Sequence, residues 1–384
     1  MNFKKLFAVL LCMVAFTVML ASCKKDDETQ YWLDKYKEMN KGQPQVIETV
    51  NVDLYIIKGD DMSADTNITK TVQDKINQYL YATYHTNINI KYISEAEYFN
   101  TVNGFTSETS GIVLVNSEET MDALKGKLVD LYPFIHGDEY KNQKYGQLNK
   151  QITTSLMNAA IVEEKGVEKL YCIPNDHVIG SYEYIVINKD LVGALGLPYS
   201  NSQYAEMTSL EDVEDLKDAA MALGASADAF VTVDYEDYNP ASGAIVTVIE
   251  NAPYVAKSVI EAVNENFVVN ISKYPVADAA EVYSSAFAIL EKAPAGVDSS
   301  LYAERAMQVI YEINANEEIR NLLQYGVENV NYYRDQDGVV IPHEEKRYDM
   351  NLLYTGDVFK AYYTEGWSEF DKLCGEMQNK DTDK

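Results

Sequence analysis

The stretch VDLYII at residues 52–57 predicts a buried β-strand that ends at Gly59. Apolar residues at helical spacing follow it, then an alternating strand, a second helix and a short buried strand. These four segments lie at 68–83, 88–92, 95–101 and 112–115. The order strand, helix, strand, helix, strand is typical of a parallel α/β sheet, so we expect an α/β fold.

The ends of the predicted strands indicate where a ligand would bind. In a parallel α/β sheet, ligands lie beyond the carboxyl ends of the strands. Lys58 and Asp60 follow the first strand, and Glu118 follows the third. We therefore expect these three residues to face a ligand, although solvated turns would give the same pattern.

Caps and turns continue the alternation of helices and strands downstream. Thr208 and Glu211 have the spacing of a capping box at the start of a helix. Either Asn314 or Asn316 is expected to cap a later helix that ends at Gly326. The Asp-Gly pair within 335–338 predicts a hairpin turn.

The amino terminus predicts export from the cytoplasm. Lys4 and Lys5 precede an apolar run from Leu6 to Ala21, which is shorter than the ~20 residues that span a bilayer. The order Leu-Ala-Ser-Cys ending at Cys23 resembles a bacterial lipoprotein signal, in which the cysteine is lipidated. We expect residues 1–22 to be the signal peptide and 23–48 a lipidated tether. An ordinary signal or an uncleaved anchor is the alternative.

The net charge argues against two kinds of partner. The chain carries −28 at pH 7, whereas a nucleic-acid-binding surface is basic. The same charge repels anionic lipid headgroups, so the expected lipid would have to hold the protein at the membrane. We expect no nucleic-acid partner.

Tyrosine is unusually frequent, with 30 residues against two tryptophans. Tyrosine serves equally in cores and at surfaces because its ring is apolar and its tip is polar. A binding cleft lined by phenol rings is the functional interpretation, and both interpretations can hold together.

No common catalytic motif is present in the sequence. It has no GxSxG elbow, no HExxH motif and no P-loop, and the four histidines are scattered. The acids at 335–338 lack the further ligands of a calcium loop. We expect no enzyme activity, no cofactor and no metal. Paired carboxylates of a glycoside hydrolase stay an alternative, because the many acids make single pairs uninformative.

Two cysteines remain beyond Cys23, namely Cys172 and Cys374. An extracytoplasmic location permits a disulfide between them. Their wide separation in the sequence leaves the pairing open.

Residues 170–198 resemble the extracellular solute-binding proteins of ABC importers. The segment LYCIP at 170–174 and the strand YIVINKDL at 184–191 match a crossing between lobes and the first strand of a second lobe. Segments at 302–307, 320–328 and 348–357 resemble a clostridial-type subgroup of these lipoproteins in the maltodextrin-binding-like superfamily. The resemblance covers roughly residues 50–380.

The resemblance implies a periplasmic-binding-protein-like (type II) fold of two α/β lobes joined by a hinge. Lobe 1 is then expected at 49–172 and 286–330, and lobe 2 at 181–283 and 335–384. The hinge crossings are expected at 173–180, 284–285 and 331–334. Such lobes close around a ligand.

The resemblance also implies which residues contact the ligand. Tyr254 follows a strand and Pro253 and matches an aromatic platform of the family, although it could instead pack beneath the helix that follows. Asn175, Asp176 and His177 lie at the lobe crossing, where relatives place polar contacts.

Two further aromatic residues near the carboxyl terminus belong to the same expectation. Relatives use aromatic side chains in this region, which makes Tyr362 and Trp367 ligand candidates. Packing in the core is the alternative role for both of them.

The expected function is capture of a soluble nutrient, an oligosaccharide by preference, for the permease of an ABC transporter. We expect a monomer anchored outside the cytoplasm by lipid, with a Gram-positive plasma membrane favoured over an outer membrane. The absence of a basic pocket motif favours a neutral ligand. The alternatives are a surface glycan- or peptide-binding lipoprotein without a transporter, and a lipid-anchored hydrolase.

Overall fold

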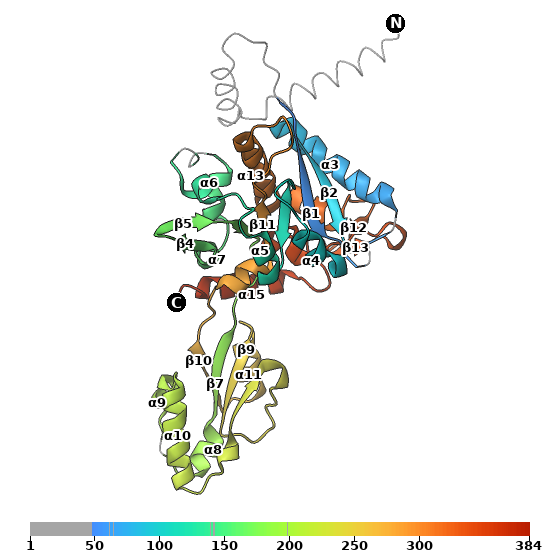
Figure 1. The fold of residues 1–384 in the computed structure, drawn as a ribbon. Helices are drawn as coiled ribbons and strands as arrows, with labels where there is room; N and C mark the ends of the chain where they lie inside the picture. Colours follow the sequence, from blue (N-terminus) through green and yellow to red (C-terminus); the bar gives the residue numbers. More distant parts are fainter. Residues whose placement is uncertain (1–47, 61, 64, 139, 141–142, 198) are drawn as a thin grey trace.

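The computed structural model describes residues 48–384 except 61, 64, 139, 141–142 and 198. It contains a five-stranded sheet in the order β2-β1-β3-β11-β6 and a four-stranded sheet in the order β10-β7-β9-β8. Helices accompany both sheets, which confirms the expected α/β class. Figure 1 shows a larger lobe around the first sheet and a smaller lobe around the second, placed end to end.

The predicted parallel sheet forms the centre of the larger lobe. Strand β1 (Val50–Ile57) pairs in parallel with β2 (Thr86–Ile93) and with β3 (Ile112–Val115). Helices α3 (Thr66–Tyr84) and α4 (Glu95–Asn103) connect them. Helix α3 buries one stripe, Ile68, Val72, Ile76, Leu80 and Tyr84, which is the apolar periodicity of its sequence.

Later segments complete this sheet. Strand β11 (Ala286–Ile289) lies antiparallel between β3 and β6 (Cys172–Pro174). Helices α13 (Ser299–Ala315) and α14 (Glu317–Tyr325) pack on the lobe, and α14 is capped by Asn316 rather than Asn314. The remaining elements before β6 are α5 (Glu118–Leu124), α6 (Tyr132–His136), η1 (Tyr145–Lys150), α7 (Thr154–Ala159), β4 (Ile161–Glu164) and β5 (Val167–Leu170).

The smaller lobe is built on β7 (Tyr182–Asn188), the predicted strand at its entrance. Strands β9 (Val246–Ala252) and β10 (Phe267–Lys273) flank β7 in antiparallel fashion, and β8 (Phe230–Asp234) runs parallel to β9. Separate apolar clusters cover the two faces of this sheet. The other elements are α8 (Lys189–Ala194), α9 (Asn201–Glu206), α10 (Leu210–Ala222), η2 (Ala227–Ala229), η3 (Tyr235–Asp237) and α11 (Ala256–Val263).

The capping box of α10 differs by one residue from the prediction. Ser209, not Thr208, accepts from the backbone of Asp212, and Asp212 bonds back to Ser209. The reason is that Asp212 stands at the third helical position, whereas Glu211 stands at the second.

The segment 335–384 contacts the larger lobe, although we expected it in the second. Arg320 of α14 donates to the carbonyls of Leu352 and Asp357, so this segment satisfies a buried guanidinium. The segment contains β13 (Val340–Pro342), which pairs with β12 (Tyr332–Arg334) as the predicted hairpin, and η4 (Glu344–Lys346), η5 (Leu352–Thr355), η6 (Val358–Lys360) and α15 (Glu369–Asp381). The boundaries of the two lobes as folding units remain predictions.

The chain passes between the sheets twice. The first crossing follows β6, and the second follows β10 and leads through α12 (Ala279–Ser284) into β11. Residues 284–285 lie beside the first crossing, whereas 331–334 belong to the β12–β13 hairpin of the larger lobe. In Figure 1, α15 lies at the base of the larger lobe, next to these crossings.

Cys172 and Cys374 are both free thiols. Burial raises the pKa of Cys172 to about 12, which keeps this thiol protonated and unreactive.

The predicted signal peptide and Cys23 lie outside the described residues, as does nearly all of the predicted tether. Among the residues that the structure describes, none of the helices is both long enough and apolar enough to cross a membrane.

Candidate functional site

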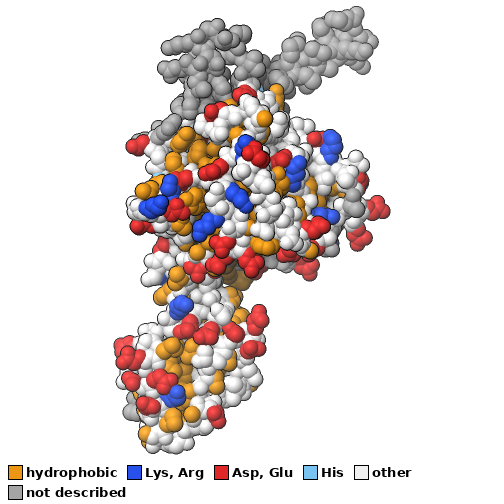
Figure 2. Space-filling model, in the orientation of Figure 1, with side chains coloured by type: hydrophobic (Ala, Val, Ile, Leu, Met, Phe, Trp, Pro, Cys, Tyr) orange, Lys and Arg blue, Asp and Glu red, His pale blue; other side chains and the backbone are white. Residues whose placement is uncertain are grey.

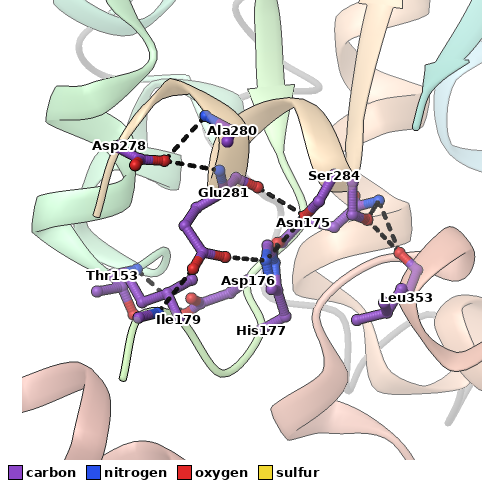
Figure 3. Close-up of polar contacts among 12 residues, drawn as sticks. Thr153, Asn175, Asp176, His177, Ile179, Asp278, Ala280, Glu281, Ser284 and Leu353 are labelled. Carbon is purple, nitrogen blue, oxygen red and sulfur yellow. Dashed lines mark hydrogen bonds and ion pairs between the residues drawn. The ribbon is translucent and has the colours of Figure 1, made fainter. Parts of the chain in front are cut away.

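The two crossings meet at a polar junction (Figure 3). Asn175, Asp176 and His177 follow β6 directly, because Pro174 ends the strand and the chain then turns toward the smaller lobe. All three residues are buried. Buried polar groups need partners, so their hydrogen bonds define the geometry of the hinge.

Asn175 joins the first crossing to the second. Its backbone N–H donates to the carbonyl of Ser285 at 2.9 Å, and its Nδ2 donates to Ser285 Oγ at 3.0 Å. Nδ2 also lies 3.3 Å from the carbonyl of Leu353, which Ser285 Oγ contacts as well. The Oδ1 of Asn175 is buried and has no hydrogen-bond partner among the described residues.

His177 makes the second link between the crossings. Its Nδ1 lies 2.7 Å from the carbonyl of Asn175, and its Nε2 lies 3.2 Å from Ser284 Oγ and 3.6 Å from Glu281 Oε2. The hydrogen bond with His177 lowers the pKa of Glu281, although burial opposes it. The other Glu281 oxygen accepts from the backbone of Gly180 at 2.8 Å. With these bonds the two crossings form one unit.

Asp176 is a buried carboxylate of this junction, and only 5% of its surface is exposed. Its Oδ2 accepts from the backbone N–H of Thr153 at 3.1 Å, and its carbonyl accepts from Val358 at 2.8 Å. Burial and, less strongly, the charge of Asp357 raise the pKa of Asp176 to about 7. Its charge is therefore sensitive to pH in the physiological range.

Helix α15 supplies two site residues that no motif in the sequence indicates. Asn379 Nδ2 donates to His177 O at 2.7 Å and to Thr153 Oγ1 at 3.0 Å, and its Oδ1 accepts from Ile179 N at 3.1 Å. Gln378 Nε2 donates to Gly180 O at 2.5 Å, while its Oε1 accepts from the backbone of Tyr254 at 3.0 Å. This amide pair holds the crossing to both lobes.

A cavity of about 610 Å³ opens beside Asp176, and we call it the hinge cavity. It lies between the η1–α7 loop, the segment around η6, and α15. Among the described residues, Phe359 is the only aromatic residue that lines it. Its charged lining consists of Lys150, Lys360, Lys372, Lys380, Asp176, Asp357, Glu376 and Asp383.

The charges in the hinge cavity are unevenly paired. Lys360 pairs with Asp357, and Lys372 lies 4.0 Å from Glu376. Lys380 has no ion-pair partner within the described part of the chain, and Lys150 contacts the amide oxygen of Gln147 at 3.1 Å. The ammonium groups of Lys150 and Lys380 thus have no ion-pair partner among the described residues.

Tyr254 lies outside the hinge cavity, at the root of the smaller lobe. It is half-buried against Tyr182, with the ring centroids 6.2 Å apart, and Tyr182 stacks on Tyr184 at 5.4 Å. Tyr182 also donates to Asp381 of α15 at 2.5 Å. The surroundings of Tyr254 thus resemble the packing alternative, and its ligand role stays a prediction.

The three residues chosen from strand ends lie apart from the hinge cavity. Lys58 is half-buried and Asp60 is exposed, on a segment that packs against the backbone of Asp349. Glu118 is exposed in the first turn of α5. None of the three lines the hinge cavity.

The two aromatic residues near the carboxyl terminus are separated in the structure. Trp367 is buried against Phe359, with the ring centroids 6.1 Å apart, and its Nε1 has no partner among the described residues. Tyr362 lines a different cavity, between α3 and α14. Within the described residues, no group of His, Cys, Asp and Glu side chains is arranged to hold a metal ion.

No protein-family model and no curated protein matches the chain. A solved structure similar to it is the N-glycan transport solute binding protein NgtS from Streptococcus pneumoniae, in complex with Man5GlcNAc. The TM-score is 0.49 at 15% identity, over 86% of this chain and 82% of that one.

Two other solved structures are also similar. A probable secreted solute-binding lipoprotein from Streptomyces coelicolor has a TM-score of 0.34 at 13% identity, over 72% of this chain and 80% of that chain. The GacH receptor of Streptomyces glaucescens, solved unliganded and with acarbose, has a TM-score of 0.28 at 10% identity, over 88% of this chain and 94% of that chain.

Proposed function

We propose that this protein is a membrane-tethered extracellular solute-binding protein that delivers an oligosaccharide to an ABC transporter. The observation that carries the proposal is the hinge: two α/β lobes are joined by two crossings, and a polar cavity opens beside them. A ligand in such a position can favour one lobe arrangement over another through its differential affinity. A transporter can then distinguish the loaded from the empty protein.

The ligand is proposed to bind in the hinge cavity, with Asp176, Asn379 and the ammonium groups of Lys150 and Lys380 as its polar partners. Asn175 and His177 are proposed to hold these ligand-binding groups in position. Their own side chains already form hydrogen bonds between the two crossings. The proposal also includes a lipid anchor at Cys23 and a permease as the partner. Both are inferred from the sequence alone.

A peptide is the second ligand class, and one observation favours it. The hinge cavity contains carboxylates as well as ammonium groups, which suits a ligand that carries both charges. Asp176 has no lysine or arginine partner within 4 Å among the described residues, so a ligand ammonium could pair with it.

The test is a thermal-shift screen of the purified protein against neutral oligosaccharides and short peptides. A ligand present at 100 times its Kd stabilises the native state by about 2.7 kcal/mol, which gives a clear rise in Tm. The variant Lys150→Ala/Lys380→Ala should reduce this rise, whereas Lys70→Ala on exposed α3 should leave it unchanged. A rise with peptides alone would replace the oligosaccharide, and no rise with either class would contradict the proposal.

A further inference from the structure

A second cavity lies on the flank of the larger lobe, away from the hinge cavity, and we call it the flank cavity. Its volume is about 670 Å³, and it shares no lining residue with the hinge cavity. Helix α3, helix α14 and the turn that follows α14 form its walls. Three tyrosines line it, namely Tyr79, Tyr332 and Tyr362.

Tyr362 is held in place by two hydrogen bonds to its backbone and by a cation over its ring. Its backbone N–H donates to Asn321 Oδ1 at 2.9 Å, and its carbonyl accepts from the hydroxyl of Tyr325 at 3.2 Å. The guanidinium of Arg334 lies 4.5 Å from the ring centroid, and Glu328 fixes it through two bonds of 3.0 and 3.2 Å. A ring fixed in this way loses little freedom when a ligand stacks on it.

The turn between α14 and Tyr332 is equally well fixed. Gly326 ends α14 with a φ of +80°, a conformation that L side chains rarely adopt. Asn331 then closes the turn: its Oδ1 accepts from Val327 N at 2.8 Å and its Nδ2 donates to Lys346 O at 2.9 Å. The cavity wall is therefore already formed without a ligand.

Three polar side chains at the flank cavity are uncommitted. Lys75, Gln78 and Glu318 are exposed, and within the described residues their side chains have no hydrogen-bond or ion-pair partner. They offer an ammonium, an amide and a carboxylate, so they can both donate to and accept from hydroxyl groups. Arg334, outside the lining, pairs with Glu328, which leaves Lys75 and Glu318 as one charge of each sign among the lining residues and favours a neutral ligand.

These features together match one class of ligand. Aromatic ring faces suit the C–H face of a pyranose, and donors and acceptors at the rim suit its hydroxyl groups. We propose that the flank cavity is a second binding site, for a neutral oligosaccharide. This site is independent of the hinge cavity, whose single aromatic lining residue is Phe359.

The experiment is saturation-transfer NMR and titration calorimetry on the full-length protein, with maltotriose, cellotriose and mannotriose as separate probes. Tyr362→Ala removes the stacking ring, and Gln78→Ala on the exposed face of α3 removes one polar contact without touching the core. The matched control is Tyr333→Ala, because Tyr333 is 43% exposed next to Tyr332 but does not line the cavity.

We expect at least one trisaccharide to bind, with a loss of affinity of about tenfold or more in Tyr362→Ala, a smaller loss in Gln78→Ala and none in Tyr333→Ala. The hinge variant Lys150→Ala/Lys380→Ala should keep this binding.

Two outcomes would overturn the second site. In the first, no trisaccharide binds the wild-type protein. In the second, Tyr362→Ala and Gln78→Ala bind as wild type does while the hinge variant does not, and the proposed function then stands alone. Binding that is weakened in Tyr362→Ala and kept in the hinge variant supports the flank cavity, and the thermal-shift screen of the hinge variant then tests the hinge cavity separately.

Discussion

Asp176 is a carboxylic acid that the fold has almost removed from water at the junction of three segments. The unfolded chain would give this group an ordinary pKa near 3.8, whereas burial and Asp357 raise it to about 7 in the native state. Between these values the native state binds the proton more tightly than the unfolded state does. The contribution of Asp176 to stability is therefore fully present below pH 4 and is lost as the pH rises through 7.

The variant Asp176→Asn should remove this pH dependence, because the amide is neutral throughout. The free energy of unfolding of the wild type should fall by on the order of 3 kcal/mol between pH 4 and pH 8, and the variant should not show this fall. Urea denaturation at both pH values measures the difference. Asp383→Asn, an exposed residue of the same cavity, is the control and should give no such gain. Parallel pH profiles for wild type and Asp176→Asn would refute the expectation.

At the scale of elements, the segment from η5 to η6 shows how closely the carboxyl-terminal part fits the larger lobe. Gly356 ends η5 with a φ of +105°, and a Cβ there would collide with the backbone of Ile313 in α13. Gly296 has a φ of +87° and open space around it. Alanine substitutions at these two glycines therefore distinguish the free-energy cost of backbone strain from that of a steric clash.

Gly356→Ala should destabilise the protein by on the order of 3 kcal/mol, since it combines strain with a clash against a helix backbone. Gly296→Ala should cost about 1 kcal/mol, from strain alone. Chemical denaturation of both variants measures the two values. Equal costs would mean that the η5 turn does not press against α13 as described.

Helix α15 is the element that we expect to govern the hinge. In Asn379→Ala, the backbone N–H of Ile179 loses its acceptor, and His177 O and Thr153 Oγ1 lose their donor. Several buried polar groups are then left without this partner. We expect faster amide hydrogen exchange at residues 177–180 in this variant. Phe370→Ala changes a side chain of the same helix that is 59% exposed, and it should leave this exchange unchanged. Unchanged exchange in Asn379→Ala would show that α15 does not hold the crossing.

At the scale of the whole molecule, the sequence predicted individual strands and helices better than it predicted contacts between segments far apart in the chain. The strand at 112–115 was predictable because its four residues are all apolar, and the strand at 52–57 because apolar residues dominate it and Gly59 follows it. The junction at Asn175 and His177 was predictable in position from the resemblance. Its partners Glu281, Gln378 and Asn379 were not, because polar side chains on short helices give no periodic signal of what they contact.

The same reasoning explains the outcome for the residues chosen at strand ends. Lys58, Asp60 and Glu118 follow strands as predicted, but a strand end does not indicate which side chains close a cavity. The hinge cavity is lined instead by loops and by α15, from parts of the chain that meet only in the folded state. Contacts of this kind depend on packing between elements, which the sequence pattern does not encode locally.

The charge of the whole molecule bears on the lipid anchor that we propose at Cys23. The chain carries −28, and Figure 2 shows acidic side chains over both lobes on the face in view. Such a surface is repelled by anionic headgroups, so the proposed attachment would require a hydrophobic anchor. Cys23→Ser should therefore release the protein from the membrane fraction into the medium, with its ligand-induced rise in Tm intact. Fractionation of cells that express each form, followed by immunoblotting, measures the release. A Cys23→Ser protein that stays with the membrane would instead indicate an uncleaved anchor in residues 1–22.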